Sequence, residues 1–406
     1  MRTVIRRIGD VCEVFDGPHA TPTPCDEGPV YLGIPSILDD GSIDYENSKR
    51  ISWEEYPRWT KRVTPQQGDV VFSYEANLDT YAIIPEGFIG CLGRRMAIMR
   101  PKKSEIIPRF LYYYMLSPQW KVVIASKTVP GATVNRIPIA TYPDFPITVP
   151  NLETQRRIAG VLSAYDELIE NNREQIKLLE EAARRLYKEW FIDLRFPGHK
   201  TAHIHNGVPE GWHTGSLLDL ADVVRGCSYS SDEIVNGGKT LINLGNLTPF
   251  GGFRFGYAKP YSGKSRDDQA VAKGDVIMGL TEQATGLAGY AALLPAIPNG
   301  SVISADLVKL VPHAGVSAVF VYAVLRFGRL SELVSPLANG TKIKHLRPES
   351  LSRVAVLLPS KRLANDYAEL VAPLYDQISI CDQRICTARE ARSRLLPKLM
   401  SGEIEV

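Results

Sequence analysis

The sequence predicts an α+β protein with an internal pseudo-twofold repeat, in which a globular domain followed by a long helix occurs twice. Two observations predict this fold class. Two helical segments carry matching heptad patterns 209 residues apart (Ile158 to Tyr367), and short motifs of the N-terminal half recur at nearly the same offset. A period of about half of the 406-residue chain indicates two domains and not a solenoid of short repeats.

Both helical segments place apolar residues at alternating steps of four and three, which is the heptad pattern of a coiled-coil helix. The positions of the first seam are Ile158, Leu162, Tyr165, Ile169, Asn172, Ile176, Leu179, Ala183, Leu186 and Trp190. Those of the second seam are Tyr367, Val371, Leu374, Ile378, Cys381, Ile385, Ala388, Arg392 and Leu395. Helices whose seams agree in phase and length can bury them against each other.

Three seam features are unusual. Asn172 either lies buried in the seam, where it would fix the register at a cost in stability, or marks a local break at the surface. Pro373 predicts a bend in the second helix, because proline removes a backbone hydrogen bond. Arg392 is the one charged residue of the second seam.

The globular domains repeat as well. The matching pairs are IGDVCEVFDG (8–17) with LLDLADVVRG (217–226), QGDVVF (67–72) with KGDVIM (273–278), and GATVNRI (131–137) with GTKIKHL (340–346). Their offsets differ by only three residues, which small loop insertions explain. The two domains therefore share one ancestral pattern.

Turn residues and apolar patterns predict the elements in order. Residues 1–150 hold short β-branched and aromatic runs broken by Gly, Pro and Asp, which predict strands, and one helical pattern from Arg109. Asn151 is a suitable N-cap for the first long helix, and Pro397 and Gly402 are expected to end the second. The expected boundaries are 1–150 for the first domain, 151–192 for a central helix, 193–211 for a Pro/Gly/His linker, 212–359 for the second domain, 360–397 for a C-terminal helix and 398–406 for a tail.

The composition excludes some classes of protein. With 47 Lys and Arg against 45 Asp and Glu, binding to phosphates would require charge gathered on one face. The N-terminus has no apolar run of signal-peptide length, and no segment approaches the ~20 apolar residues of a membrane span. Six dispersed cysteines without CxxC spacing predict reduced thiols and a cytoplasmic protein.

Motifs of catalysis are missing from the sequence. Gly238-Lys239-Thr240 ends like a phosphate-binding loop, but Glu233 stands where that loop needs glycine. His199, His203 and His205 are interpreted as solvated residues of a flexible linker and not as metal ligands. No Gly-rich nucleotide fingerprint, no Asn/Asp-Pro-Pro-aromatic tetrapeptide of adenine methyltransferases and no activated nucleophile is recognisable. The chain is therefore predicted to bind and not to catalyse.

The whole chain resembles the DNA specificity subunits of type I restriction–modification systems. The resemblance rests on GATVNRI (131–137), PITVPNLETQRRIAGVLSAYDELIENNREQIKLLEEAARRLYKEWF (146–191), FPG (196–198), VPEGW (208–212) and the terminal RSRLLPKLMSGEIEV. Their order and their duplication make it specific, and it covers essentially the full sequence.

The resemblance implies that each globular domain is a target recognition domain and that the helices form an antiparallel coiled coil between them. Each domain would read one half of a bipartite double-stranded DNA target, and helix length would set the spacer. Two methyltransferase subunits would dock on the coiled coil and bring S-adenosylmethionine for methylation of adenine N6. Two motor-nuclease subunits would bring ATP and Mg²⁺. This chain itself would hold no cofactor and no metal.

Candidate DNA contacts follow from exposed polar residues and from the family's recurrent turn. Arg and Lys suit guanine edges or phosphates, and Asn suits adenine. The candidates in the first domain are Thr133, Asn135, Arg136, Tyr74, Lys61, Arg62, Arg94 and Arg95. Those in the second are Thr341, Lys342, Lys344, His345, Arg254, Lys264 and Arg266.

Two other classes of protein compete with this interpretation. A fused methyltransferase or nuclease would need motifs that the sequence lacks. A coiled-coil scaffold that binds protein and no DNA is compatible with the helices alone, but the FPG…VPEGW linker and the LLPKLMSGEI tail argue against it.

Overall fold

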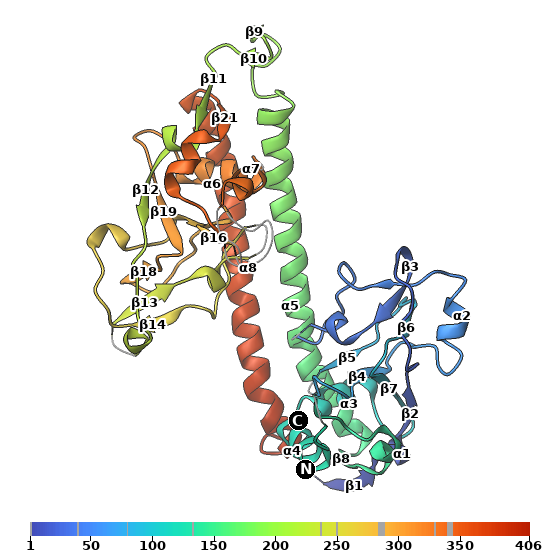
Figure 1. Ribbon diagram of the computed structural model, residues 1–406. Helices are drawn as coiled ribbons and strands as arrows, with labels where there is room; N and C mark the ends of the chain where they lie inside the picture. The colour runs from blue at the N-terminus through green and yellow to red at the C-terminus, as the bar shows by residue number, and fades with distance from the viewer. Residues whose placement is uncertain are drawn as a thin grey trace. The chain divides into compact units, whose positions relative to one another are not determined.

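The computed structural model describes residues 2–38, 40–78, 80–131, 134–235, 238–248, 251–282, 289–328, 330–338 and 344–406. The chain divides into two units. Met1–Leu168 and Ala388–Val406 form the first unit, and Ile169–Thr387 forms the second. Both long helices are shared between the units, so the first unit combines the two ends of the chain (Figure 1).

The first unit contains an antiparallel four-stranded sheet. Its order is β2 (Cys12–Asp16), β7 (Met96–Pro101), β4 (Val70–Ser73) and β5 (Tyr81–Ile83). Two further strand pairs are β1 (Thr3–Arg7) with β8 (Pro146–Pro150), which is antiparallel, and β3 (Cys25–Leu32) with β6 (Gly90–Leu92), which is parallel. The central strand β4 is buried along its whole length, as its apolar residues Val70, Val71 and Phe72 require, and the polar Ser73 at its end is buried too.

Aromatic side chains fill the core beside this sheet. The helical elements are α1 (Ile8–Val11), η1 (Ile34–Ser36), α2 (Tyr56–Trp59), α3 (Pro108–Met115), α4 (Pro118–Lys127) and η2 (Ile139–Asp144). Proline begins both α3 and α4, where its missing N–H is not needed, and Ser117 caps α4 by accepting from the amide of Trp120. Phe72 of β4 stacks on Tyr142 at 4.7 Å between ring centroids.

The second unit repeats this topology. Its four-stranded sheet has the order β12 (Ala221–Arg225), β19 (Leu307–Pro312), β15 (Val276–Gly279) and β17 (Ala291–Leu293). β11 (His213–Ser216) pairs with β21 (Ala355–Leu358), and β13 (Lys239–Ile242) pairs in parallel with β18 (Ser301–Ile303) and antiparallel with β14 (Lys259–Tyr261). β16 (Thr281–Glu282) pairs with β20 (Lys344–His345). The tandem repeat predicted from the motifs is thus present in the strand order.

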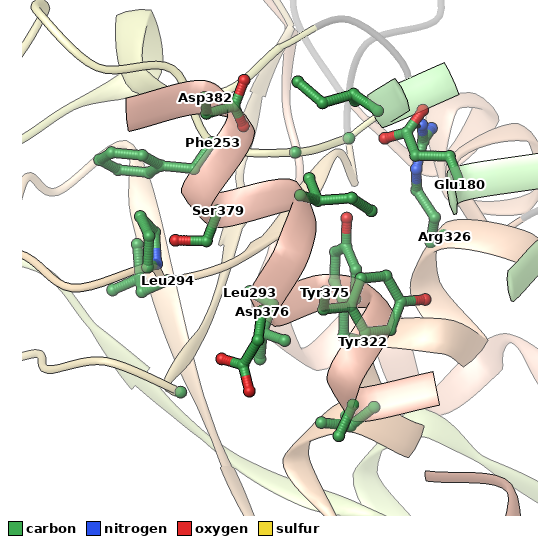
Figure 2. Close-up of a pocket in the computed structure, with 18 of the residues that line it drawn as sticks. Glu180, Phe253, Leu293, Leu294, Tyr322, Arg326, Tyr375, Asp376, Ser379 and Asp382 are labelled. Carbon is green, nitrogen blue, oxygen red and sulfur yellow. Dashed lines mark hydrogen bonds and ion pairs between the residues drawn. The ribbon is translucent and has the colours of Figure 1, made fainter. Parts of the chain in front are cut away.

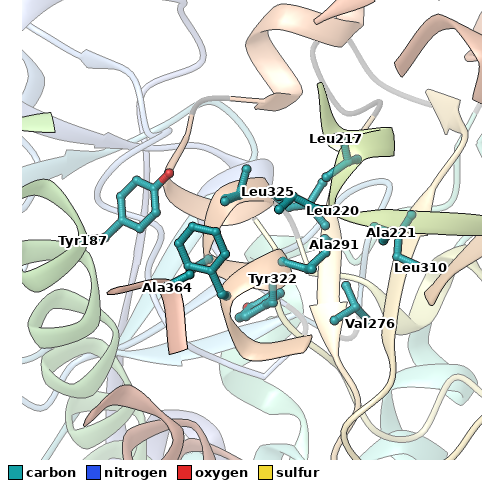
Figure 3. Packing of buried hydrophobic residues seen from close by; sticks show 14 of the residues in the cluster. Tyr187, Leu217, Leu220, Ala221, Val276, Ala291, Leu310, Tyr322, Leu325 and Ala364 are labelled. Carbon is teal, nitrogen blue, oxygen red and sulfur yellow. The ribbon is translucent and has the colours of Figure 1, made fainter. Parts of the chain in front are cut away.

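One core joins this sheet to both long helices. The helical elements around it are η4 (Leu217–Asp219), η5 (Ser231–Glu233), η6 (Leu244–Asn246), η7 (Asp267–Gln269), α6 (Ala318–Phe327), α7 (Leu330–Val334), η8 (Ser335–Leu337) and η9 (Pro348–Arg353). Figure 3 shows Tyr187, Val276, Tyr322 and Ala364 meeting in this core, from the first long helix, β15, α6 and the second long helix. Burial of such apolar area is the main stabilising term of folding.

Both units contain the same turn before their central strand. Gly68 and Gly274 have φ of +87° and +88°, a conformation that strains other residues. The following Asp69 accepts from the amide of Gln66 and pairs with Arg100 at 2.8 Å, and the aspartate of the second turn is held in the same way by a lysine of β19. This explains why QGD and KGD recur in the sequence.

The long helices are α5 (Leu152–Tyr187), extended by the π-helical turn η3 (Lys188–Ile192), and α8 (Lys361–Ser401). Within the second unit, the Tyr367 hydroxyl donates to the carbonyl oxygen of Ala183 at 3.1 Å, and the Cys381 thiol donates to Gln175 Oε1 at 3.4 Å. Residue numbers fall along α8 as they rise along α5, so the helices are antiparallel.

Every seam position of the two helices is buried or half-buried. Asn172 is 3% exposed, so it lies inside the seam and not at a surface break. Arg392 forms an ion pair with Asp166 of α5. The seam of α8 therefore accommodates its one charged residue by giving it a carboxylate from the partner helix.

The structure corrects two expectations, one about the end of the second long helix and one about the linker. α8 does not end at Pro397 but continues to Ser401, because Leu399 and Met400 are buried in the core of the first unit. The segment expected to be a flexible linker holds a two-stranded hairpin of β9 (Ile204–His205) and β10 (Val208–Pro209). Its flanking rings, Phe196 and Trp212, are buried with centroids 5.1 Å apart. Among the described residues, no helix combines the length and apolarity needed to cross a membrane.

Candidate nucleic-acid interface

In the first unit, the turn that precedes η2 pairs with the end of β4. The Ile137 amide donates to the Tyr74 carbonyl at 2.8 Å, and the Ala76 amide donates to the Asn135 carbonyl at 3.1 Å. Arg136 lies opposite Glu75 in this pairing. The side chains of Asn135 and Arg136 are exposed, so the backbone holds two predicted contact residues on the surface. Thr133 lies outside the described residues.

The second unit repeats this pairing. The Leu346 amide donates to the Leu280 carbonyl at 2.7 Å, and His345 lies opposite Thr281. Lys344 is half-buried and His345 is exposed. Thr341 and Lys342 lie outside the described residues. The predicted contact segments of the two units therefore occupy the same place on one repeated scaffold.

The side chains at matched positions differ in chemistry. In the first unit, Glu75 forms an ion pair with Arg95 at 2.9 Å. In the second unit, Thr281 donates to Asp306 Oδ1 at 2.8 Å. The backbone is the same, because the residue before Glu75 donates to the Arg95 carbonyl at 3.2 Å and the residue before Thr281 donates to the Asp306 carbonyl at 2.8 Å. The two units thus share this backbone arrangement but carry different side chains on it.

The cations of the first unit fall into two groups. Arg95 is paired with an acid as described, and Arg62 lies 3.8 Å from Asp16 while donating to the Gly17 carbonyl. In contrast, Lys61 and Arg94 are exposed, and neither has an acidic partner in the part of the chain that the structure describes. Arg136 is likewise exposed without one. The unpaired cations are the better candidates for phosphate contacts.

Tyr74 is 7% exposed, so little of the side chain is free to touch a ligand. Its hydroxyl and Asp16 Oδ1 are both buried. Burial, followed by the negative charge of Asp16 and a hydrogen bond to it, raises the pKa of the Tyr74 hydroxyl well above its ordinary range, so the hydroxyl stays protonated.

The predicted cations of the second unit are held in different ways. Arg254 lies over the ring of Tyr257 at 4.9 Å, and Tyr257 is 49% exposed. Arg266 is paired with Asp268 at 2.9 Å, which reduces its value as a phosphate ligand. Lys264 is exposed, and its carbonyl oxygen accepts from the Tyr261 hydroxyl at 2.9 Å. Exposed rings beside cations are typical of surfaces that bind nucleic acid.

Other cations were missed by the sequence reasoning. Lys259 lies over the exposed ring of Tyr229 at 5.8 Å. Arg225 and Arg347 line an open cavity of about 690 Å³ together with His345. Arg225 lies at the repeat position of Asp16. Because these two residues have opposite charges, aligning the two halves of the sequence did not identify Arg225 as a candidate contact.

Comparison with known proteins agrees with the resemblance. Residues 3–181 match the family model of the type I restriction modification DNA specificity domain. The type I restriction enzyme MjaIX specificity subunit of Methanocaldococcus jannaschii is 25% identical, over 99% of this chain and 93% of that protein. The type I restriction enzyme HindI specificity subunit of Haemophilus influenzae is 19% identical, over 84% and 85%. Along nearly its whole length, the chain is therefore similar to specificity subunits of type I restriction–modification systems.

A solved structure shares this fold. The S subunit of a type I restriction–modification system from M. genitalium superposes with a TM-score of 0.61 at 15% identity, over 98% of this chain and 96% of that chain. Specificity subunits confer DNA sequence specificity and are the non-catalytic members of these systems. The prediction of a binding protein and not an enzyme is therefore confirmed.

A second cavity of the protein lies in its second unit, beside both long helices (Figure 2). It has a volume of about 500 Å³ and mostly apolar walls. Glu180 of α5 pairs with Arg326 of α6 at 3.2 Å, and Asp376 of α8 pairs with Lys273 at 2.8 Å. Each ion pair joins the globular part of the second unit to one of the long helices. Together they help to orient that globular part on the helices.

The residues whose sequence pattern is similar to catalytic or metal-binding motifs have structural roles in this protein. Lys239 lies in strand β13 and donates to Ser265 Oγ at 2.7 Å, so it is not part of a phosphate-binding loop. His199 Nδ1 lies 2.9 Å from the Phe196 carbonyl oxygen. Within the described ranges, no three His, Cys, Asp or Glu side chains are placed to hold a metal ion.

Proposed function

We propose that this protein is a specificity subunit that reads a bipartite DNA target, with the turn beside the central sheet of each unit contacting one half-site. The single observation that carries the proposal is the repeated backbone pairing, 74–76 with 135–137 and 280–281 with 345–346, which bears different side chains in the two units. A repeated scaffold with unlike polar groups suits two half-sites of unlike sequence.

The contact chemistry follows from the side chains. In the first unit, Arg136 suits a guanine edge and Asn135 an adenine edge, while Lys61 and Arg94 suit phosphates that set the position of the duplex. In the second unit, Lys344 and Arg254 are assigned to the same kind of contact. Boundaries of 1–150 and 212–359 for the two target recognition domains belong to this proposal.

The antiparallel helices have two proposed tasks. Their length sets the unread spacer between the half-sites. Their outer faces dock the methyltransferase subunits, because Leu178, Leu370 and Ile380 are 70%, 55% and 39% exposed on helices whose seams are already buried. Apolar side chains on a solvent-facing helix indicate a protein partner.

The partner subunits would perform the chemistry. We assign two methyltransferase subunits, which bring S-adenosylmethionine and methylate adenine N6, and two motor-nuclease subunits, which use ATP and Mg²⁺. The complex would act in the cytoplasm, where its DNA lies.

The proposal is tested by a methylome. This chain is expressed with its methyltransferase subunit in a host without adenine methylation, and N6-methyladenine is mapped by single-molecule sequencing. We expect one new bipartite motif with a fixed gap, and substitution of Arg136 and Asn135 by alanine is expected to relax only one half of it.

The competing function is a coiled-coil scaffold that binds protein without reading DNA. It would be supported if a stable complex with the methyltransferase subunit forms and no methylated motif appears. Recovery of one half-site alone would show that only one unit reads DNA.

A further inference from the structure

A chain of hydrogen bonds in the second unit orients His345. Thr281 Oγ1 lies 2.8 Å from Asp306 Oδ1 and 3.2 Å from His345 Nδ1. An ionised carboxylate can only accept, so the single hydroxyl proton of Thr281 is directed to Asp306. The Thr281 oxygen then accepts from His345, which places a proton on Nδ1. Asp306 thus selects the tautomer of a ring two side chains away.

The other ring nitrogen is left for a ligand. With Nδ1 protonated, the neutral imidazole carries a lone pair at Nε2. The His345 side chain is exposed and lines the cavity of about 690 Å³ described above. Its backbone is held by the pairing with Thr281 and by the bond from the Leu346 amide to the Leu280 carbonyl. The backbone that carries His345 is therefore held in place by hydrogen bonds on both sides.

The cavity also supplies positive charge. Arg225 and Arg347 line it and are both exposed, and neither forms an ion pair within the described ranges. The one carboxylate in the lining is that of Glu349, so arginines outnumber acids there. Exposed arginines without partners suit phosphate oxygens, which fix the position of a duplex without reading its sequence. The cavity therefore combines groups that hold a backbone with one oriented acceptor.

We propose that His345 reads a base with an exocyclic amino group, adenine or cytosine, in the half-site bound by the second unit. This inference rests on the proposed function and names the chemistry of one position in it. In the major groove, adenine N6 and cytosine N4 donate, whereas the matching atoms of guanine and thymine are acceptors. A lone pair at Nε2 accepts a hydrogen bond from the amino group of adenine or cytosine, and it repels the acceptor oxygen of guanine or thymine.

The first unit supports the assignment by contrast. Arg136 occupies the repeat position of His345, and the Thr281–Asp306 hydrogen bond is replaced there by the Glu75–Arg95 ion pair. A guanidinium can only donate, so the same scaffold position would select an acceptor-bearing base in the first half-site.

The test uses the complex of the full chain with its methyltransferase subunit. Methylation rates are measured on duplexes that carry the mapped motif with each base pair of the second half-site changed in turn. We expect His345→Ala to reduce the preference for adenine or cytosine at one position by roughly 5- to 150-fold, the range typical of one good base contact. Thr281→Val is expected to relax the same position, because it frees the ring without removing it.

Arg347→Ala is the matched control, because it is expected to slow methylation of all duplexes alike and to leave every preference unchanged. The first half-site serves as an internal control in each variant. Loss of a guanine or thymine preference in His345→Ala, or no change at any position, would overturn the inference while leaving the proposed function intact. A wild-type complex without a bipartite motif would instead remove the proposed function itself.

Discussion

At the residue scale, Asp166 of α5 is the point where three elements of the first unit meet. Its carboxylate accepts from Arg392 of α8 and from the hydroxyl of Tyr113 of α3. Burial, followed by the charge of Asp166, raises the pKa of Tyr113 well above its ordinary range, so the hydroxyl stays protonated as a donor. The Arg392 and Asp166 side chains are 21% and 24% exposed. Loss of one partner therefore leaves a largely desolvated charge.

Replacement of Arg392 by alanine is expected to lower the free energy of unfolding by about 2 kcal/mol, below the 3–5 kcal/mol of a fully buried pair because some water remains. Urea denaturation measures the change. Arg394→Ala is the control, because Arg394 is 77% exposed and pairs with Glu390 one turn away, a contact that contributes less than about 0.5 kcal/mol. Equal effects of the two variants would show that the Asp166 pair adds nothing.

Single residues were predictable from the sequence only where the pattern itself was broken. Arg392 stood out as a charge in an apolar seam, but its partner Asp166 lies beside the seam and is identified only once the antiparallel register is known. Arg225 carried no signal, because its repeat partner is the acidic Asp16. The same backbone position carries an acidic residue in one unit and a basic residue in the other. The repeat therefore predicts where a side chain lies but not its charge.

At the scale of elements, α8 is one helix through two prolines. Pro373 is exposed, while Val371 and Tyr375 on either side of it are buried. The seam contacts therefore hold the helix together across a missing backbone hydrogen bond. Packing outweighs local propensity in this helix, as is usual for helices in folded proteins.

Pro373→Ala is expected to stabilise the protein by about 1–2 kcal/mol, less than the full ~3 kcal/mol difference between the two residues because the native helix has adapted to the ring. The measurement is the shift in denaturation midpoint. Pro197→Ala, at an exposed position outside a helix, is the control and should be neutral or slightly destabilising. A less stable Pro373→Ala variant would mean that the seam depends on the shape that proline imposes.

The sequence predicted the long helices well because a heptad seam is a strong periodic signal. It predicted the linker poorly. Asn206-Gly207 is a recognised hairpin turn signal, and both residues have positive φ, 51° and 79°, yet the flanking strands are only two residues long. Strands this short have no period to detect. The end of α8 was misplaced because proline was weighed without the buried residues that follow it.

At the scale of the whole molecule, the two units share a strand order and the two helices. Their sheets, β2-β7-β4-β5 and β12-β19-β15-β17, have the same connectivity. What differs is the set of side chains at the turns beside these sheets. The proposed division of labour is that the sheets and helices stay constant while the turns and the outer helix faces meet DNA and protein partners.

Leu178→Asp is expected to weaken binding of the methyltransferase subunit at least tenfold, because a charge would enter an apolar interface. The melting temperature should stay unchanged, since Leu178 is 70% exposed. Binding is measured by calorimetry or by gel filtration of the mixed subunits. Lys177→Asp, at an exposed polar neighbour, is the control, and equal loss in both variants would point to a general charge effect.

The division of the chain into units has a consequence for biosynthesis. The second unit, 169–387, is contained within one continuous stretch, whereas the first requires residues 388–406 as well. The first unit therefore cannot close during synthesis until residues 388–406 have been made, whereas the second unit needs no residue beyond 387. A chain cut after residue 387 would lack the helical turns that cover the core of its first unit, so that core would be more open to proteases.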